Sequence, residues 1–351
     1  MSSPDSEPRG PSAVPPSWGW ARGTQQLRNV ETEPLDYHRL LRGASAYRWW
    51  KPLALLLLSG VFFGTLTVVV TAVVIPVLLL TDPDYPVQVA AGTAAALDTQ
   101  RPVSVLVSMV SIIIMLPAVL LAMLVLGMRP IGRIWSVAAR MRWGLLGRLF
   151  GVSVLTIAVM NLVGIAAGAL LEPATDPAVV ANETAFDARA ALLSVLLVLL
   201  LVPLQSTAEE VVFRGLFMQV LGAWLRNPWF AILIPSIGFA SLHIYDIWGL
   251  LAVGLLGAVS AWLTWRTGGL EAAIAIHIVN NYVAFGIMAS GLTGETAQTT
   301  GDGSAGGLIG QIAGLALFAW LTLRVFTRGG YGRQRIDLVQ YTAEPQERGT
   351  R

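Results

Sequence analysis

The feature that most constrains this chain is a series of long apolar segments separated by polar links. Eight of them follow one another, and each is close to the ~20 residues that a helix needs to cross a bilayer. They cover residues 52–81, 102–127, 149–171, 190–208, 229–245, 248–266, 268–292 and 307–326. We therefore expect an all-α, polytopic membrane protein with about eight transmembrane helices.

The overall composition is also that of a membrane protein. Hydrophobic residues make up 55% and charged residues 13% of the chain, whereas a soluble domain carries about 25% charged residues. The mean hydropathy is +0.65. The chain has no cysteine, which excludes disulfides, thiolate metal sites and a cysteine nucleophile. The N-terminus is polar and rich in proline, so it does not have the pattern of a cleavable signal peptide.

The charges of the links predict how the chain is oriented. Arginine is in excess before the first segment and in every second link, and acidic residues dominate most of the links between. Cytosolic loops of membrane proteins carry such an excess of arginine. We therefore expect a multi-pass protein of the cell membrane with both termini in the cytosol. We expect no nucleic-acid partner. The absence of an internal repeat disfavours inverted-repeat transporters.

Five parts are expected along the chain. They are a disordered cytosolic tail (1–37), an N-terminal membrane region of three spans (38–189), a catalytic membrane region (190–292), the last loop and span (293–326), and a cytosolic C-terminal tail (327–351). As one helix, residues 190–225 would be about 54 Å long, which exceeds a bilayer core of ~30 Å. We expect Pro203 to kink this helix, and residues from about 210 to 225 to lie along the cytosolic interface or re-enter.

Ionisable and amide side chains gather between Glu209 and Asn281. Ionisable groups at membrane depth are costly, so they mark a functional site or are well paired. Glu210 and Arg214 are four residues apart, so they share a helix face and can pair. Glu209 lies on the adjacent helix face and has no such partner. It is therefore free to act as a base near neutral pH. On this segment alone, an interfacial cluster of salt bridges is an equally good interpretation.

Two of the three histidines lie in apolar segments, and the third, His38, lies in the polar tail. His243 is either a core histidine bonded to a carbonyl or a catalytic group that Asp246 could orient. His277 and Asn281 are four apart and project from one helix face. Hydrogen-bond donors fixed in this way stabilise an oxyanion, although a plain interhelical bond worth about 1 kcal/mol is the alternative.

Two neighbours of this pair have simpler interpretations. Asn280 could take the place of Asn281. Glu271 is expected to begin the same helix, where the helix dipole favours an anion, and not to be catalytic.

Three sequence blocks at these residues resemble the CPBP family of intramembrane proteases, which includes the type II CAAX prenyl endopeptidases and the bacterial bacteriocin-processing and immunity (Abi) proteins. The family pattern is Glu-Glu-x-x-x-Arg, then Phe-x-x-x-His, then His-x-x-x-Asn. Here the blocks are EEVVFR starting at Glu209, FASLH ending at His243, and HIVNN ending at Asn281. All three are complete and in order, and the resemblance covers roughly residues 190–292.

The resemblance implies a CAAX-protease-like bundle of eight helices that hydrolyses a peptide bond within the membrane. The implied catalytic residues are Glu209, His243, His277 and Asn281, supported by Glu210 and Arg214. Glu209 would activate water with the help of His243, while His277 and Asn281 would form an oxyanion hole. The implied substrate is a membrane-embedded or lipidated protein or peptide, cut near the cytosolic face.

Metal dependence and function both have alternatives. Glu209, His243 and His277 would suit a zinc site with an open position. No His-Glu-x-x-His helix is present, and Glu209 cannot easily be both ligand and base, so we favour water activated by glutamate and keep zinc open. A non-catalytic membrane scaffold, or a protein of the bacteriocin-immunity type, is the second candidate function. A proton-coupled transporter that uses these residues as a relay is the third.

Overall fold

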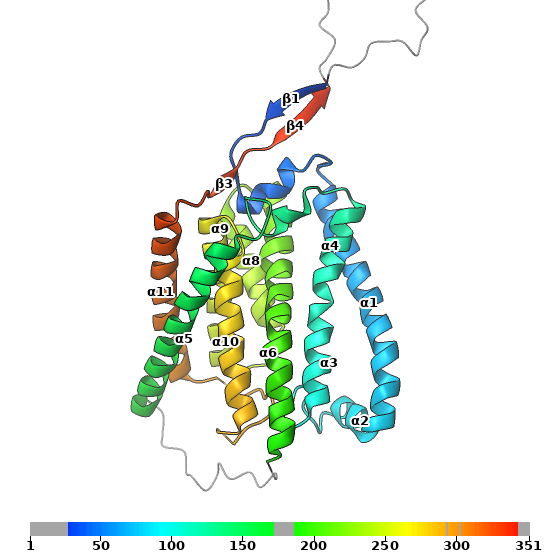
Figure 1. The fold of residues 1–351 in the computed structure, drawn as a ribbon, viewed down its shortest axis with the longest axis vertical. Coiled ribbons are helices and arrows are strands. Elements are labelled where there is room, and N and C mark those ends of the chain that lie inside the picture. The colour runs from blue at the N-terminus through cyan, green and yellow to red at the C-terminus, as the bar shows by residue number, and fades with distance from the viewer. Residues whose placement is uncertain (1–26, 172–185, 293, 302, 343–351) are drawn as a thin grey trace, which may run out of the picture.

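The protein folds into a bundle of long helices with a small ribbon of strands at one end (Figure 1). The computed structural model describes residues 27–171, 186–292, 294–301 and 303–342. The helices are α1 (Lys51–Thr81), α2 (Asp84–Ala90), α3 (Pro102–Ile113), α4 (Met115–Val125), α5 (Trp143–Leu171), α6 (Ala188–Glu210), α7 (Met218–Trp224), α8 (Pro228–Ser241), α9 (Ile247–Thr267), α10 (Glu271–Ser290) and α11 (Ala305–Arg328). Short 3-10 helices lie at Tyr37–Gly43 (η2) and Ile131–Ile134 (η3), and a π-helix, Val211–Phe217 (η4), joins α6 to α7. The strands are β1 (Leu27–Glu31), β2 (Leu35–Asp36), β3 (Gln334–Arg335) and β4 (Leu338–Thr342).

Seven helical segments in the described ranges are long and apolar enough to cross a membrane. One of them consists of α3 and α4 together, and another of α6, η4 and α7. The expected all-α, polytopic membrane fold is confirmed. The segment predicted as the fifth span, 229–245, differs from the expectation. It forms α8, whose 14 residues give a length of only about 21 Å, because the chain leaves helical geometry after Ser241.

The segment between Ala188 and Trp224 is helical throughout. Pro203 lies inside α6 and does not end it. The irregularity begins further along, where the backbone changes from α- to π-helical geometry directly after Glu210. α7 then packs against η2 and α8. That residues 210–225 lie at the cytosolic interface remains a prediction.

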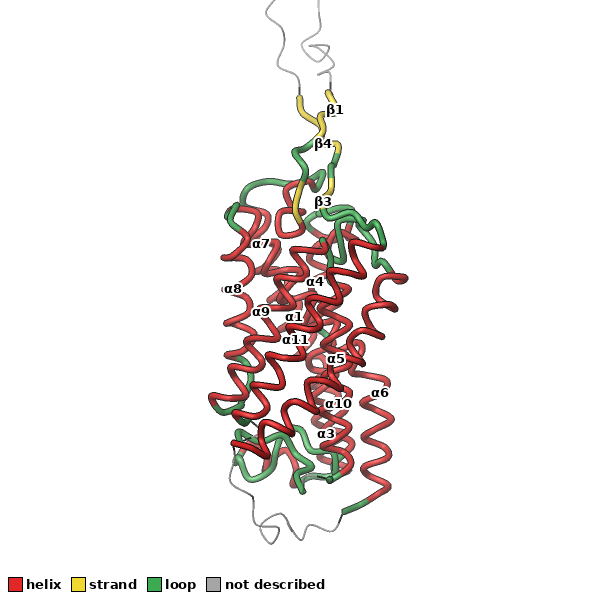
Figure 2. Tube along the Cα trace, turned by 90° about the vertical axis from the view of Figure 1, so that its left-hand side faces the viewer, coloured by secondary structure: helices red, strands yellow, loops and turns green. Residues whose placement is uncertain are grey.

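Both ends of the described chain meet at one end of the bundle (Figures 1 and 2). β1 pairs antiparallel with β4, and β2 pairs antiparallel with β3. Residues 27–36, expected to be part of a disordered tail, therefore contain two strands. The rest of both predicted tails, residues 1–26 and 343–351, lies outside the described residues. Local composition could not indicate these strands, because their partners lie at the opposite end of the sequence.

The 3-10 helix η2 holds this end of the molecule together. His38, expected in a polar tail, is in fact buried, and its Nε2 lies 3.2 Å from the carbonyl oxygen of Arg226. A buried ion pair fixes the C-terminal segment beside it: Arg133 donates to both carboxylate oxygens of Asp337, at 2.6 and 2.9 Å. Arg133 also donates to the carbonyl of Gly43, at 2.7 Å.

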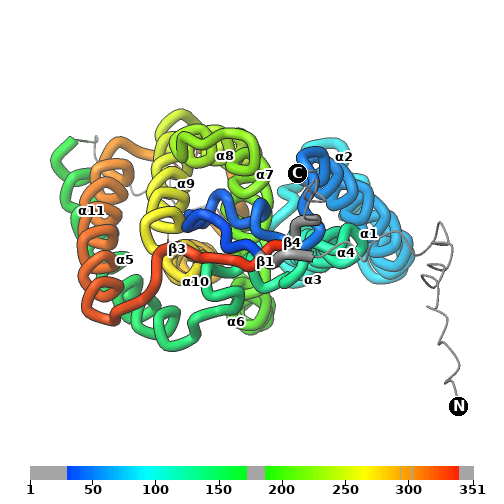
Figure 3. Tube along the Cα trace, turned by 90° about the horizontal axis from the view of Figure 1, so that it is seen from above, coloured from blue at the N-terminus to red at the C-terminus, as the bar shows by residue number. Residues whose placement is uncertain are grey.

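α10 is the helix around which the site is built. Seen along the bundle, it lies among α5, α6 and α9, and it packs against all three (Figure 3). Every residue from Glu271 to Val279 is buried. On its far side, α5 and α11 approach closely at glycines, with Gly164 of α5 against Gly310 of α11. Small residues allow such close contact between helices in lipid.

Candidate active site

The two glutamates stand at the point where α6 changes into the π-helix η4. Glu209 and Glu210 are the last residues of α6, and Arg214 lies inside η4. Short π-helical stretches within α-helices are often found at functional sites. Arg214 Nη1 lies 2.9 Å from Glu210 Oε1, so the ion pair predicted from their spacing is confirmed.

His277 of α10 lies between the two carboxylates. Its Nε2 is 3.2 Å from Glu209 Oε2, and its Nδ1 is 2.7 Å from Glu210 Oε1. The side chains of Glu210 and Arg214 are each 1% exposed, whereas that of Glu209 is 12% exposed. Glu209 is therefore the member of this carboxylate–imidazole cluster that a water molecule or substrate could reach.

The protons of this cluster can be assigned from its hydrogen bonds. An ionised carboxylate only accepts, so Nδ1 of His277 donates to Glu210. A second proton has to lie between His277 Nε2 and Glu209, because two lone pairs would otherwise face each other. The Arg214 guanidinium balances the charge of Glu210, and the proton shared with His277 balances that of Glu209. A site removed from water requires such compensation.

Asn281 lies one turn after His277 and faces α6. Its Nδ2 donates to Gln205 Oε1 at 3.1 Å and to Ser206 Oγ at 3.3 Å. Asn280 does not take its place: it donates to Asn281 Oδ1, at 3.4 Å. Gln205 and Ser206 were missed from the sequence. The signal that could have revealed them is the polar run Gln-Ser-Thr inside an apolar segment, just before the glutamates.

His243 lies beside the cluster but is not part of it. It follows α8, in the non-helical link to α9, and its Nδ1 is 2.8 Å from the carbonyl oxygen of Phe239. Nδ1 therefore donates, and Nε2 carries the lone pair. The Phe239 ring meets both imidazoles edge-on, with centroids 4.8 Å from His243 and 5.8 Å from His277. Within the described residues, no direct hydrogen bond joins His243 to Glu209.

Two acidic residues near the histidines stabilise the structure, one as a helix cap and the other in an ion pair. Asp246 accepts a hydrogen bond from the backbone nitrogen of Gly249, at 2.8 Å, and so caps α9; it does not orient His243. Glu271 begins α10 as expected and is fully buried. It accepts two hydrogen bonds from the Arg142 guanidinium, at 2.8 and 2.6 Å, and a third from the Arg142 backbone nitrogen, at 3.0 Å. From the sequence, Arg142 was only one of several loop arginines.

A zinc site made of Glu209, His243 and His277 does not fit this arrangement. In the ranges that the structure describes, no three His, Asp or Glu side chains form a group that could hold a metal ion. A ligating imidazole has to offer a lone pair to the metal, but both ring nitrogens of His277 face carboxylates. The residues present do not supply three ligands.

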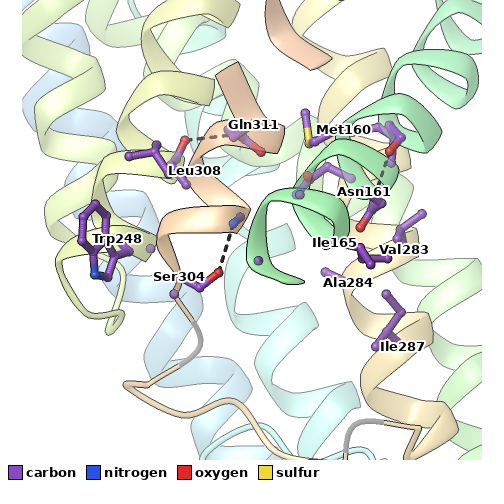
Figure 4. A pocket seen from close by; sticks show the side chains of 18 of the residues that line it. Met160, Asn161, Ile165, Trp248, Val283, Ala284, Ile287, Ser304, Leu308 and Gln311 are labelled. Carbon is purple, nitrogen blue, oxygen red and sulfur yellow. Dashed lines mark hydrogen bonds between the residues drawn. The ribbon is translucent and has the colours of Figure 1, made fainter. Parts of the chain in front are cut away.

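A cavity of about 660 Å³ lies between α5, α9, α10 and α11 (Figure 4). Asn161, Trp248 and Gln311 are among the side chains on its wall, and neither glutamate of the cluster lines it. Asn280 also lines it and bonds to Asn281. The cavity is thus separate from Glu209 and touches the site only through this asparagine pair.

The fold is that of a polytopic membrane protein, and it carries a carboxylate–imidazole cluster inside its helical bundle. Residues 190–283 match the family model described as "Type II CAAX prenyl endopeptidase Rce1-like". This match lies over the same residues as the three motifs, and it confirms the resemblance that they indicated.

One curated relative is described as "Uncharacterized protein YyaK", from Bacillus subtilis (strain 168). The two sequences are 34% identical over 90 residues, which are 24% of this chain and 30% of the relative. The similarity therefore spans less than a third of the relative's length. No solved structure matches the chain.

Proposed function

We propose that this protein is an intramembrane endopeptidase in which Glu209 activates the water that attacks a peptide bond. The observation that carries the proposal is the carboxylate–imidazole cluster, in which Glu209 is the accessible member and His277 lies 3.2 Å from it. A general base has to lie close to a proton acceptor or donor that balances its charge as the proton moves. His277 provides that balance here.

Glu210 and Arg214 are the supporting residues in this mechanism. The Glu210 carboxylate, 2.7 Å from Nδ1, keeps the hydrogen on that nitrogen and turns Nε2 toward Glu209. Arg214 Nη1 in turn lies 2.9 Å from Glu210 Oε1 and holds that carboxylate in place. His277 thus acts as the partner of the base, and not as the free oxyanion donor implied by the resemblance, since both of its nitrogens are already engaged.

Asn281 is then the side chain that donates to the developing oxyanion. Its Nδ2 group exchanges the longer of its two bonds, the 3.3 Å bond to Ser206, for the substrate oxygen. Such a donor, fixed in advance, contributes most in a site that excludes water. His243 Nε2 accepts a hydrogen bond from the attacking water. Glu209 takes the proton that the water loses, and gives it to the nitrogen of the departing amine as the C–N bond breaks.

The depth of the cluster supports cleavage near the side of the membrane where the termini lie. His277 is six residues from the start of α10, or about 9 Å. Glu209 is about 32 Å from the far end of α6. We propose that this side is the cytosol, as the arginine-rich links predict. The substrate would be a membrane-embedded or lipidated protein or peptide, cut close to that interface.

The test is cleavage of fluorogenic peptides by the detergent-purified protein. A farnesylated CAAX peptide and the same peptide without the lipid are compared for the wild type, Glu209→Gln and the surface control Glu33→Gln. We expect Glu209→Gln to lower kcat/KM by at least about 1000-fold, and Glu33→Gln to match the wild type. Equal cleavage by the wild type and Glu209→Gln, or no cleavage by the wild type, counts against the proposal and favours a non-catalytic scaffold.

A further inference from the structure

Gln205 is a buried polar side chain that the proposed mechanism has not yet used. It lies on α6, one turn before Glu209, and is 4% exposed. A carboxamide buried in an apolar helix costs free energy unless its oxygen and its nitrogen both find partners. The partners of Gln205 therefore indicate why the site holds it.

The Gln205 side chain bonds to the proposed oxyanion donor and shares a helix face with the proposed base. Its Oε1 accepts from Asn281 Nδ2 at 3.1 Å and from Ser206 Oγ at 3.2 Å. The same side chain stands four residues before Glu209 on α6. Residues four apart share a helix face, so α6 itself places Gln205 next to Glu209. The interhelical contact with α10 supplies Asn281.

We propose that Gln205 is a positioning residue that couples the base to the oxyanion donor. It holds the Glu209 carboxylate through its N–H group and the Asn281 carboxamide through its oxygen. This inference rests on the function proposed above and adds to it a residue that lies outside the three motifs.

The hydrogen-bond network explains why Gln205 in particular can do this. The ionised Glu209 carboxylate only accepts, so Gln205 has to turn Nε2 toward it. Its Oε1 then faces α10, and Asn281 has to present Nδ2, the group that an oxyanion needs. The bond from Asn280 to Asn281 Oδ1, at 3.4 Å, requires the same orientation of Asn281. Two separate contacts thus fix one orientation of the amide.

A purely structural role would give a different kinetic pattern. An interhelical hydrogen bond in a membrane bundle contributes about 1 kcal/mol of stability, and its loss would lower the amount of folded enzyme without changing kcat per folded molecule. A positioning role lowers kcat and leaves substrate binding intact, because only the transition state needs the aligned donor. The two roles are therefore separated by kcat, KM and folding measured together.

The experiment compares Gln205→Met with Gln311→Met in the full-length protein, using the peptide that the wild type cleaves. Gln311 is the matched control: it is also buried, on α11, and it bonds to the carbonyl of Ala252 away from the cluster. We expect Gln205→Met to lower kcat by about 10- to 100-fold, with KM within about twofold. Gln311→Met should keep both constants within about twofold. Thermal unfolding verifies that each variant is folded.

A second variant and a double mutant complete the test. Gln205→Asn keeps the polarity of the site but is one methylene too short to reach both partners, so its kcat should fall between those of the wild type and Gln205→Met. In an Asn281→Ala background, Gln205→Met should lower kcat by a smaller factor than it does in the wild type, because one of the two groups that it positions is already gone.

The outcomes separate this inference from the proposed function. Wild-type kcat in Gln205→Met, wild-type kcat in Gln205→Asn, or fully additive losses in the double mutant would each overturn the positioning role while Glu209-dependent cleavage remains. Loss of Glu209 dependence itself would overturn the proposed function, and this inference with it.

Discussion

At the scale of single residues, Arg214 shows how closely charge is balanced in this bundle. Its guanidinium is 1% exposed, donates to Glu210 and lies over the Phe239 ring, with 4.4 Å between the guanidinium carbon and the ring centroid. Cation–π contact and ion pairing together replace water around the group. Removing the cation would leave Glu210 and Glu209 with only His277 to balance them.

We predict that Arg214→Met destabilises the fold by about 3 kcal/mol, because it leaves a buried carboxylate without its partner. Unfolding of the purified protein, followed by temperature or denaturant, measures this change. The control is Arg101→Met, whose pair with Asp82 spans 3.4 Å and is about one third exposed. It should cost less than about 1 kcal/mol. Equal stability losses in the two variants would contradict the prediction.

A second residue-scale prediction concerns pH. Burial lowers the pKa of His38, which lies outside the membrane spans. The unfolded chain therefore binds a proton at His38 more readily than the folded protein does. This contribution to stability is complete above pH ~6.5 and is lost as the pH falls below that value. The melting temperature should drop between pH 7.5 and pH 5.5, and less so in His38→Gln. An unchanged drop in the variant would exclude His38 as its source.

The residue scale also shows what the sequence could predict. The pair of Glu210 and Arg214 follows from spacing on one helix, and the structure confirms it. The bond between Gln205 and Asn281 joins α6 to α10, so it depends on the relative height of two helices, which no local pattern encodes. The separation of His243 from the cluster has the same origin, because it depends on where α8 ends.

At the scale of elements, the glycines between α5 and α11 determine how closely these helices pack. A Cβ added at Gly310 would lie 2.7 Å from the Cα of Gly164. Backbone atoms cannot rotate away as a side chain can, so the helices themselves would have to separate. α5 also packs against α10, so this contact supports the helix that carries His277.

We predict that Gly310→Ala destabilises the bundle by about 1–3 kcal/mol, the usual cost of overpacking. The matched control is Gly151→Ala on α5, where an added Cβ meets nothing within 4 Å. That change should be neutral or slightly stabilising, since alanine favours a helix over glycine. Thermal unfolding of both variants measures the difference, and a stable Gly310→Ala would show that α5 and α11 are less closely packed than described.

The sequence predicted the helices well where a long apolar segment alone determines that a helix forms. Seven of the predicted spans correspond to helices long enough to cross a membrane. α8 is shorter than its apolar segment, because the link with His243 is equally apolar but not helical. The π-helix after Glu210 also went unpredicted, since a change in hydrogen-bond register leaves no mark in composition.

At the scale of the whole molecule, the buried ion pair between Arg133 and Asp337 joins the C-terminal segment to the bundle. The two side chains are 2% and 6% exposed, and Arg335 donates to the same carboxylate, at 2.7 Å. This network holds β3, and the link from β3 to β4, against η2 and η3. The closed ribbon therefore depends on charge as well as on strand pairing.

We predict that Asp337→Asn loosens this end of the protein by about 3 kcal/mol, because Arg133 is then buried without its counter-ion. Limited proteolysis with trypsin should release the C-terminal segment markedly faster than in the wild type. Asp36→Asn serves as the control: Asp36 is 24% exposed, and its closest cation, Arg333, is 4.0 Å away. Wild-type cleavage rates in Asp337→Asn would mean that strand pairing alone holds the ribbon.

The pairing of β1 with β4 also sets an order of events during biosynthesis. Leu27 lies opposite Thr342, so the first strand to leave the ribosome has no partner until nearly the whole chain has been translated. All of the membrane-spanning helices are made before the ribbon can close. Among the elements that the structure describes, the ribbon therefore forms last, after insertion has brought β1 and β4 to one side.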